Sequence, residues 1–163
     1  MKTAREHLAD WLRDAYAMEM QATQMIESML SRLKNYPEVE ARLNQHLEET
    51  RQQAEQVRDC LQRLGTDTSS LKTTIGMFTG AMQAFSGTIF EDEVVKSGTF
   101  SYGFEQWEIA NYNALIETAE IAGEPEIRTT LEGILRQEEA MADWLKQNMP
   151  GIIRQYVATG EKR

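Results

Sequence analysis

The stretch 104–112 constrains the fold most, because it places two carboxylates where a helix would carry core residues. Its stripe, extended toward the C-terminus, advances by alternating steps of three and four residues, which is typical of a helix packed in a bundle. The stripe consists of Glu105, Glu108, Tyr112, Leu115, Ala119 and Ala122. Ionised carboxylates are almost never fully buried unless they are paired or bound to a cation. We therefore searched the other helices for further ligands at the same depth.

The composition favours long helices and argues against several classes of protein. The 163 residues suffice for one domain, 1–163, and contain only three prolines and ten glycines. No apolar run approaches the roughly 20 residues that span a bilayer. Residues 1–7 lead into an amphipathic pattern and not into the apolar core of a signal peptide. The single cysteine excludes an internal disulfide. We therefore expect a cytoplasmic protein. The net charge of −9 argues against nucleic-acid binding, which depends on Lys and Arg.

Two long helices separated by a short break are predicted over about 3–34 and 37–64. Thr3 and Glu6 have the spacing of a capping box, in which each side chain satisfies a backbone donor of the first turn. Pro37 suits the first turn of the second helix. The sequence therefore predicts an antiparallel helical hairpin.

Polar residues interrupt the middle of both stripes. The first helix carries Glu19 at a stripe position. The second stripe is apolar at its ends and polar in its middle, where His46, Glu49 and Gln53 share one patch of surface because each lies about one turn from the next.

A second hairpin is predicted over about 100–122 and 126–148, because Gly123 is typical of the residue after a helix end and Pro125 of the next helix start. Glu138 stands in the middle of its second stripe.

The segments outside the two hairpins are predicted to be shorter or looser. The connection between the hairpins, roughly 35 residues long, permits a crossover. An amphipathic pattern predicts one short helix over about 69–87, with at most one or two further turns after it. Pro150 predicts the end of the last helix, and the tail 150–163 is expected to be loosely held.

The acidic residues of the four long helices lie at one depth of the predicted bundle. Glu19 and Glu49 are at similar distances along the chain from the first break, and Glu108 and Glu138 are at similar distances from the second. A single such glutamate often lies at the edge of a buried face, but four unpaired ones at one level would cost several kcal/mol each. One bound dication, or a pair of them, resolves this conflict, and carboxylate-rich sites suit iron and manganese.

Four stretches carry a resemblance to a known family, and they cover parts of 10–19, 45–53, 104–110 and 138–145. With these stretches the chain resembles the ferritin-like superfamily and, more closely, the YciE/YciF family of small bacterial stress-associated proteins, especially the YciE type. The resemblance implies an all-α, ferritin-like four-helix bundle with extra short helices in a long crossover. It also implies a di-metal centre and a homodimer.

The chain departs from the Glu-x-x-His pattern that two of the four helices usually contribute to ferritin-like di-iron sites. At that spacing Glu49 is followed by Gln52, and Glu138 by Met141. A site richer in oxygen ligands favours harder ions. For two divalent ions, iron or manganese, we predict as ligands Glu19, Glu49, Gln53, Glu105, Glu108 and Glu138, with Glu108 or Glu49 as the bridge. As residues that orient these ligands we predict His46, Asp143, Asp14 and Tyr112.

Three functions are compatible with these patterns. The leading hypothesis is a redox-active di-metal protein that reacts with dioxygen or peroxide in a bacterial stress response, with ferroxidase- or peroxidase-like activity. The alternative is a non-catalytic stress-associated interaction protein that uses a structural metal or none. An iron-storing cage is the third, and it would require a shell-forming interface.

Overall fold

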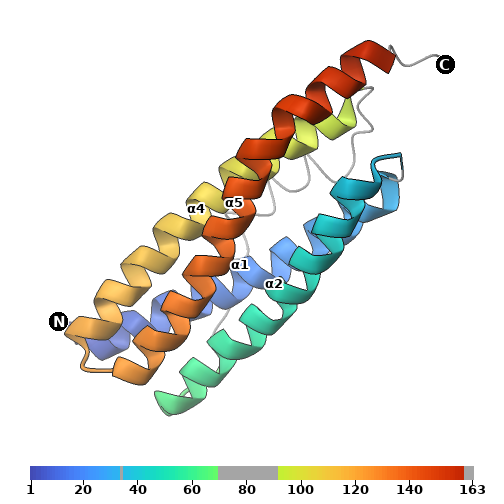
Figure 1. Ribbon diagram of the computed structural model, residues 1–163. Coiled ribbons are helices and arrows are strands. Elements are labelled where there is room, and N and C mark those ends of the chain that lie inside the picture. The colour runs from blue at the N-terminus through green and yellow to red at the C-terminus, as the bar shows by residue number, and fades with distance from the viewer. Residues whose placement is uncertain (34, 70–91, 160–163) are drawn as a thin grey trace.

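The computed structural model describes residues 1–33, 35–69 and 92–159, and these form a bundle of four long helices (Figure 1). The helices are α1 (Ala4–Arg32), α2 (Pro37–Arg63), α4 (Glu93–Ile121) and α5 (Pro125–Thr159). The described ranges contain no strand. The predicted all-α four-helix bundle is therefore confirmed, whereas the short helix predicted over 69–87 falls almost wholly outside the described residues.

The helices form two antiparallel hairpins, α1–α2 and α4–α5 (Figure 1). α2 ends near the end of the bundle where the N-terminus lies, and α4 begins near the opposite end. These positions of the two helix ends agree with the predicted long crossover. Contact is most extensive within each hairpin, weaker between α1 and α4, and sparsest between α2 and α5.

The helix ends follow the local sequence signals. The Thr3 side chain accepts a hydrogen bond from the Glu6 backbone N–H, and the Glu6 carboxylate accepts one from the Thr3 N–H at 2.7 Å, so the predicted capping box is confirmed. Gly65 and Gly123 have φ angles of 75° and 71°. Only glycine adopts this left-handed conformation without strain, which explains both helix stops.

α4 begins at Glu93, earlier than the predicted start near 100. Val94, Ser97 and Ser101 are buried and continue the inward stripe of this helix toward its N-terminus. The hydrophobic pattern did not predict this continuation, because serine is not counted among the apolar residues that mark the buried face of a helix. At Gly98 a Cβ would meet the end of the Met149 side chain of α5, which would have to move to make room.

α5 continues through Pro150 to Thr159, so the predicted helix end at 148 and the loose tail are wrong for 150–159. A proline inside a helix removes one backbone donor and strains the preceding turn. Here Ile152 and Tyr156 pack against buried apolar residues of the bundle, and this contact favours continuation of the helix.

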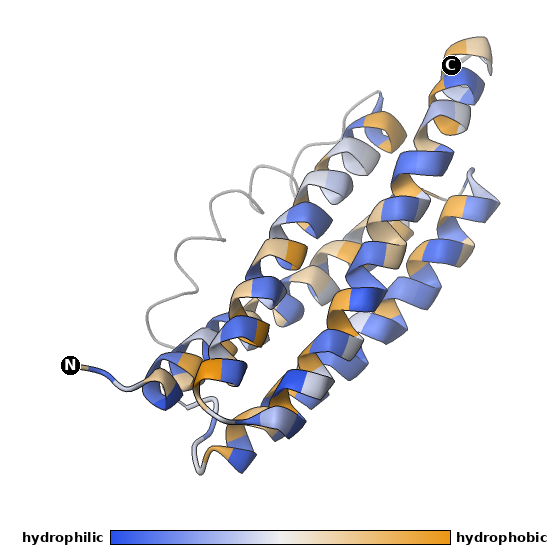
Figure 2. Ribbon diagram, turned by 60° about the vertical axis from the view of Figure 1, so that its left-hand side comes forward, coloured by the Kyte–Doolittle hydropathy of each residue, from blue (hydrophilic) through white to orange (hydrophobic). Residues whose placement is uncertain are grey.

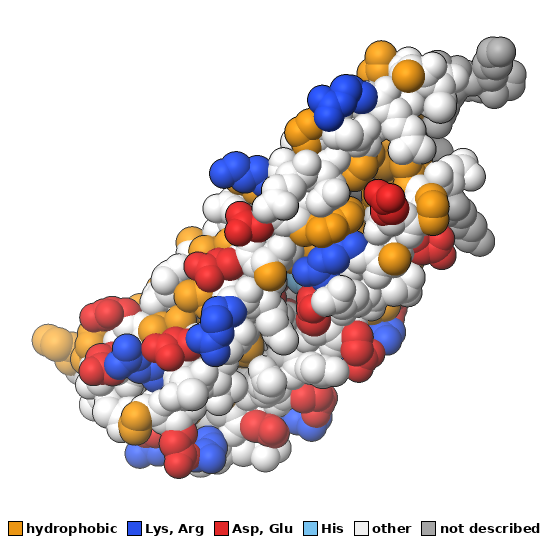
Figure 3. All heavy atoms as spheres, in the orientation of Figure 1, with side chains coloured by type: hydrophobic (Ala, Val, Ile, Leu, Met, Phe, Trp, Pro, Cys, Tyr) orange, Lys and Arg blue, Asp and Glu red, His pale blue; other side chains and the backbone are white. Residues whose placement is uncertain are grey.

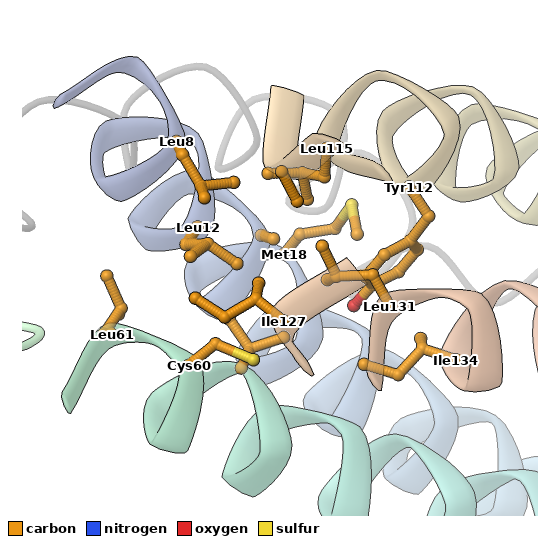
Figure 4. Close-up of a cluster of buried hydrophobic side chains, with 13 residues drawn as sticks. Leu8, Leu12, Met18, Cys60, Leu61, Tyr112, Leu115, Ile127, Leu131 and Ile134 are labelled. Atoms are coloured by element: carbon orange, nitrogen blue, oxygen red, sulfur yellow. The ribbon is translucent and has the colours of Figure 1, made fainter. Parts of the chain in front are cut away.

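Two clusters of apolar side chains fill the bundle on either side of a polar layer. The first apolar cluster draws on all four helices (Figure 4) and contains Leu8, Leu12, Ala15, Met18, Val57, Cys60, Leu61, Tyr112, Leu115, Ala119, Ile127, Leu131 and Ile134. The second contains Met25, Ile26, Met29, Leu33, Val39, Leu43, Leu47, Val94, Met141 and Leu145. Apolar and polar segments alternate along each helix, as expected for amphipathic helices around a core (Figure 2). Among the described helices, none combines the length and apolar character needed to cross a membrane.

Candidate metal centre

Buried polar side chains from all four helices form one layer between the two apolar clusters. None of them is more than 2% exposed, and they are Glu19, His46, Thr50, Gln53, Glu105, Glu108 and Glu138. The position of this polar layer along the bundle axis follows from the sequence of each helix. On α5, for example, Glu138 lies between Ile134 of the first cluster and Met141 of the second. The same stripe spacing that buries the aliphatic residues therefore buries the carboxylates.

Four side chains of the layer converge on one point. His46 of α2, Glu105 and Glu108 of α4, and Glu138 of α5 each offer a ligand atom, and these atoms all lie within 4.8 Å of one another. An imidazole nitrogen with three carboxylate oxygens is a donor set that suits divalent iron, manganese or zinc. The group can hold a metal ion.

His46 bridges two carboxylates in the described structure. Its Nε2 lies 3.2 Å from Glu105 Oε1, and its Nδ1 lies 3.4 Å from Glu49 Oε2. Burial alone would lower the pKa of His46, but the charge and hydrogen bond of Glu105, together with the hydrogen bond of Glu49, raise it to about 10. The imidazole is therefore protonated in the metal-free protein, and a metal on Nε2 would displace that proton.

Three carboxyl groups of the layer, those of Glu19, Glu108 and Glu138, have raised pKa values. Burial raises the pKa of Glu108 and of Glu138 well above the usual value, and nearby carboxylates raise both further. Burial also raises the pKa of Glu19 to about 8, although the Tyr112 hydrogen bond and the His46 charge oppose this shift. At neutral pH the metal-free layer keeps protons that a bound cation would replace.

Several oxygens of the layer are buried without a hydrogen-bond partner. They are Glu19 Oε2, Gln53 Oε1, Glu105 Oε2, Glu108 Oε1 and Glu138 Oε2. Native proteins leave few buried polar atoms unsatisfied, and such atoms require an explanation. Coordination to a cation would satisfy all of them together, so the residues present fit a metal centre.

Two neighbouring groups orient the carboxylates of the layer. The Tyr112 hydroxyl donates to Glu19 Oε1. Gln53 Nε2 donates to Glu138 Oε1 and, at 3.0 Å, to Gln137 Oε1. Partners of this kind fix the rotamers of metal ligands and tune their basicity.

Five of the six ligands predicted from the sequence lie in this layer, and Glu49 does not. The Glu49 side chain is 18% exposed, with Arg42 Nη1 at 3.1 Å and Gln45 Nε2 at 2.7 Å. Burial alone would raise its pKa, but hydrogen bonds from His46 and Gln45 and the charge of Arg42 lower the pKa to about 2. Glu49 therefore contacts His46 from outside the polar layer. His46 itself is one of the candidate ligands.

The sequence contained a signal for this arrangement. His46 occupies a stripe position of α2, four residues before Thr50 and seven before Gln53, whereas Glu49 lies one residue off that stripe. Of the other residues predicted to orient the ligands, Tyr112 contacts the layer, Asp14 is partly buried and Asp143 is exposed. Gln137 was not predicted, because it lies off the buried stripe of α5.

Comparisons with known proteins agree with this architecture. The family described as a domain of unknown function, DUF892, matches residues 3–158. A crystal structure of a protein from Xanthomonas campestris is 38% identical, with a TM-score of 0.82 over 98% of this chain and 99% of that chain. YcfI from Rhodopseudomonas palustris is 26% identical, with a TM-score of 0.71 over 89% of this chain and 94% of that chain. The Escherichia coli stress protein YciF has a TM-score of 0.82 over 94% and 99% of the two chains, and at 21% identity it shows likeness of fold.

Proposed function

This chain belongs to the DUF892 family of YciE/YciF-type helical proteins, and from that premise we propose that it binds divalent iron or manganese in the polar layer and reacts with dioxygen or peroxide. The observation that carries the proposal is the set of unpartnered buried oxygens beside His46. Burial of several carboxylate oxygens without hydrogen-bond partners opposes folding, so such groups are not expected in a purely structural core.

The proposed site holds two ions. His46, Glu105, Glu108 and Glu138 would hold the first, and the free oxygens of Glu19 and Gln53 would contribute to the second. Glu108 is the better candidate for the bridge, since Glu49 is already engaged by Arg42 and Gln45.

The residues of the layer would act by releasing protons and excluding water. Bound iron or manganese would supply redox chemistry and polarise an oxygen-containing substrate. On metal binding the carboxyls and His46 would lose the protons that they hold in the metal-free state. Tyr112 would keep Glu19 in place, and the flanking apolar clusters would exclude bulk water.

Elemental analysis after anaerobic reconstitution with ferrous or manganous ions tests the metal centre. We expect about two ions per chain, as in two-metal carboxylate sites. Glu138→Gln should lose most of this metal, whereas Glu139→Gln, at the adjacent exposed position, should retain it. Wild-type protein that stays metal-free, or Glu138→Gln protein that loads normally, would contradict the proposal.

The redox reaction needs its own assay. Loaded wild-type protein should accelerate peroxide-dependent oxidation of added ferrous iron, and Glu138→Gln should not. Equal rates for the two proteins would contradict the redox part of the proposal. Metal binding would then be decided by the elemental analysis alone.

The metal-free state supports a second candidate, a non-catalytic stress-associated interaction protein. The His46–Glu105 contact and the raised pKa values of Glu108 and Glu138 limit the net charge of the layer without any ion. A structural role has been suggested for the relative YcfI. A melting temperature that is indifferent to both chelator and added metal would favour this candidate.

The assembly is part of the proposal. We infer a homodimer with a role in a bacterial stress response, as the relative YciF is described as a stress protein. Light scattering distinguishes a dimer from the much larger mass of an iron-storing cage.

A further inference from the structure

A groove of about 370 Å³ opens between α2 and α5. Its walls include Gln56 and Cys60 on α2 and Thr130 and Gly133 on α5. These two helices make the sparsest contact among the neighbouring helices of the bundle. A Cβ added at Gly133 would approach only the Arg136 side chain, at 3.9 Å, so the space beside this glycine is open.

The inner end of the groove reaches the polar layer. Gln137 lines the groove and is partly exposed, and its Oε1 accepts a hydrogen bond from Gln53 Nε2 at 3.0 Å. Gln53 is fully buried and also donates to Glu138 Oε1. Two amide side chains therefore connect the groove to a carboxylate of the candidate metal centre.

Gln53 provides a second observation that points to a cation. Its Oε1 is buried and has no hydrogen-bond partner, while its Nε2 serves two acceptors. Amide oxygens are hard donors that suit divalent ions with oxygen ligands. An ion that reaches Gln53 would find this oxygen without a competing hydrogen bond.

The size of the groove also fits a hydrated dication. An ion with six waters occupies roughly 200 Å³ at about 30 Å³ per water, which is less than the volume of the groove. Acidic and basic side chains are interspersed on the face seen in Figure 3. At the groove, Arg63 is paired with Glu126, and the carboxylate of Asp59 and the guanidinium of Arg136 beside Gly133 carry opposite charges.

The other described cavity does not offer such a path. It is about 20 Å³ in volume and is lined mainly by apolar residues of the second cluster, including Met29, Leu43 and Leu145. A hydrated ion would not fit there.

We propose that the α2–α5 groove is the route by which divalent cations reach the polar layer, with Gln137 and Gln53 passing the ion to Glu138. This inference rests on the proposed metal-binding function. In this role the two glutamines determine how fast the site loads, and the carboxylates determine how tightly the ion is held.

The test measures the rate of Co²⁺ uptake by metal-free full-length protein in a stopped-flow instrument, through the visible absorption of bound cobalt. Gly133→Leu should fill the groove and slow uptake at least tenfold, with the final amount of bound cobalt unchanged. Gly151→Leu is the matched control, because it also replaces a glycine of α5 and a Cβ there meets nothing within 4 Å. Both substitutions raise the helix propensity of α5, so a difference in uptake rate between the two variants measures the effect of filling the groove.

A second blocking variant guards against misfolding of Gly133→Leu. Gln56→Trp changes an exposed position on the α2 wall, and Gln52→Trp, one turn away and also exposed, is its control. Slower uptake in Gln56→Trp alone would support the route. Equal uptake rates in blocking and control variants would overturn the route and leave the metal site intact, whereas wild-type protein that binds no cobalt would overturn both proposals.

Discussion

The first apolar cluster and the polar layer are equally buried, yet burial acts on them in opposite directions. Leu131 in the cluster and Glu19 in the layer are both 0% exposed. Burying a leucine stabilises the fold by about 1.5–3 kcal/mol. Burying a carboxylate opposes folding, which is visible in the raised pKa values of Glu19, Glu108 and Glu138. The comparison indicates that the apolar clusters stabilise the bundle, whereas the polar layer lowers the stability of the metal-free protein.

The largest effect is expected from a cavity in the first cluster. Leu131→Ala should lower the free energy of unfolding by about 2–5 kcal/mol, because the packed neighbours cannot fully close the cavity. Urea denaturation of metal-free and metal-loaded protein measures this loss, which should be the same in both states. A loss below about 1 kcal/mol would mean that the cluster is not the main source of stability.

The reverse sign is expected when a carboxylate of the layer becomes apolar. Glu108→Leu should raise the free energy of unfolding of the metal-free protein by about 1–4 kcal/mol, because it removes a desolvated acid from among other acids. The same variant should lose its stabilisation by metal. Glu117→Leu, at an exposed position of α4, is the control in the same denaturation series.

A loss of stability in Glu108→Leu would contradict the comparison. It would show that the carboxyl of Glu108 makes favourable interactions in the metal-free protein, and the layer would then have to be regarded as part of the stabilising core.

The same comparison explains how far the sequence alone could predict this molecule. Stripe periodicity identified Glu105, Glu108 and Glu138, because a helix buries whatever residue occupies its inward positions. The relation between His46 and Glu49 was harder, because chemical expectation favoured the glutamate as a ligand while the periodicity favoured the histidine. When the two disagree, side-chain direction along the helix is the stronger physical constraint.

Tertiary contacts account for what the sequence did not predict. The early start of α4 depends on how Ser97 and Ser101 pack, and the continuation of α5 past Pro150 depends on contacts of Ile152 and Tyr156. Gln137 contributes through its hydrogen bond to Gln53, which is distant in the sequence. None of these contacts leaves a periodic signal in its own segment.

A smaller effect is expected from pH, and it should distinguish the two regions without mutation. The pKa of Glu19 is about 8 in the folded state against an ordinary value of 4.5, so at intermediate pH the folded state holds a proton that the unfolded state lacks. Stability of the metal-free protein should therefore fall as pH rises from about 5.5 to 7, whereas at lower pH the lowered pKa of Glu49 acts in the opposite direction. One such proton changes the free energy of unfolding by about 1.36 kcal/mol per pH unit, or about 2 kcal/mol between pH 5.5 and 7.

Urea denaturation across this pH range measures the slope. Leu131→Ala should lower stability at every pH and keep the slope, whereas Glu19→Gln should reduce the slope, and the raised pKa values of Glu108 and Glu138 should maintain the remainder. With metal bound the slope should weaken or reverse, because ionised carboxylates bind the ion more tightly. A metal-free protein whose stability rises with pH would mean that the acids of the layer are ionised in the folded state.

The smallest effect is expected at Tyr112, the residue that belongs to both regions. Its ring packs in the first apolar cluster (Figure 4). Its hydroxyl donates to Glu19. Tyr112→Phe keeps the ring and removes one buried hydrogen bond, so the free energy of unfolding should fall by about 1 kcal/mol. The pKa of Glu19 should rise further, since the Tyr112 hydrogen bond opposes the effect of burial. Metal affinity, measured by calorimetry, should fall by about tenfold through the loss of an orienting partner.

Tyr102→Phe on the same helix is the control, because Tyr102 lies among the residues packed against the second cluster and outside the polar layer. If Tyr112→Phe changes stability but not metal affinity, the hydroxyl serves only the fold, and Glu19 must be held by its own packing. If Tyr112→Phe changes metal affinity far more than stability, the ring of Tyr112 serves the fold and its hydroxyl serves the candidate metal site.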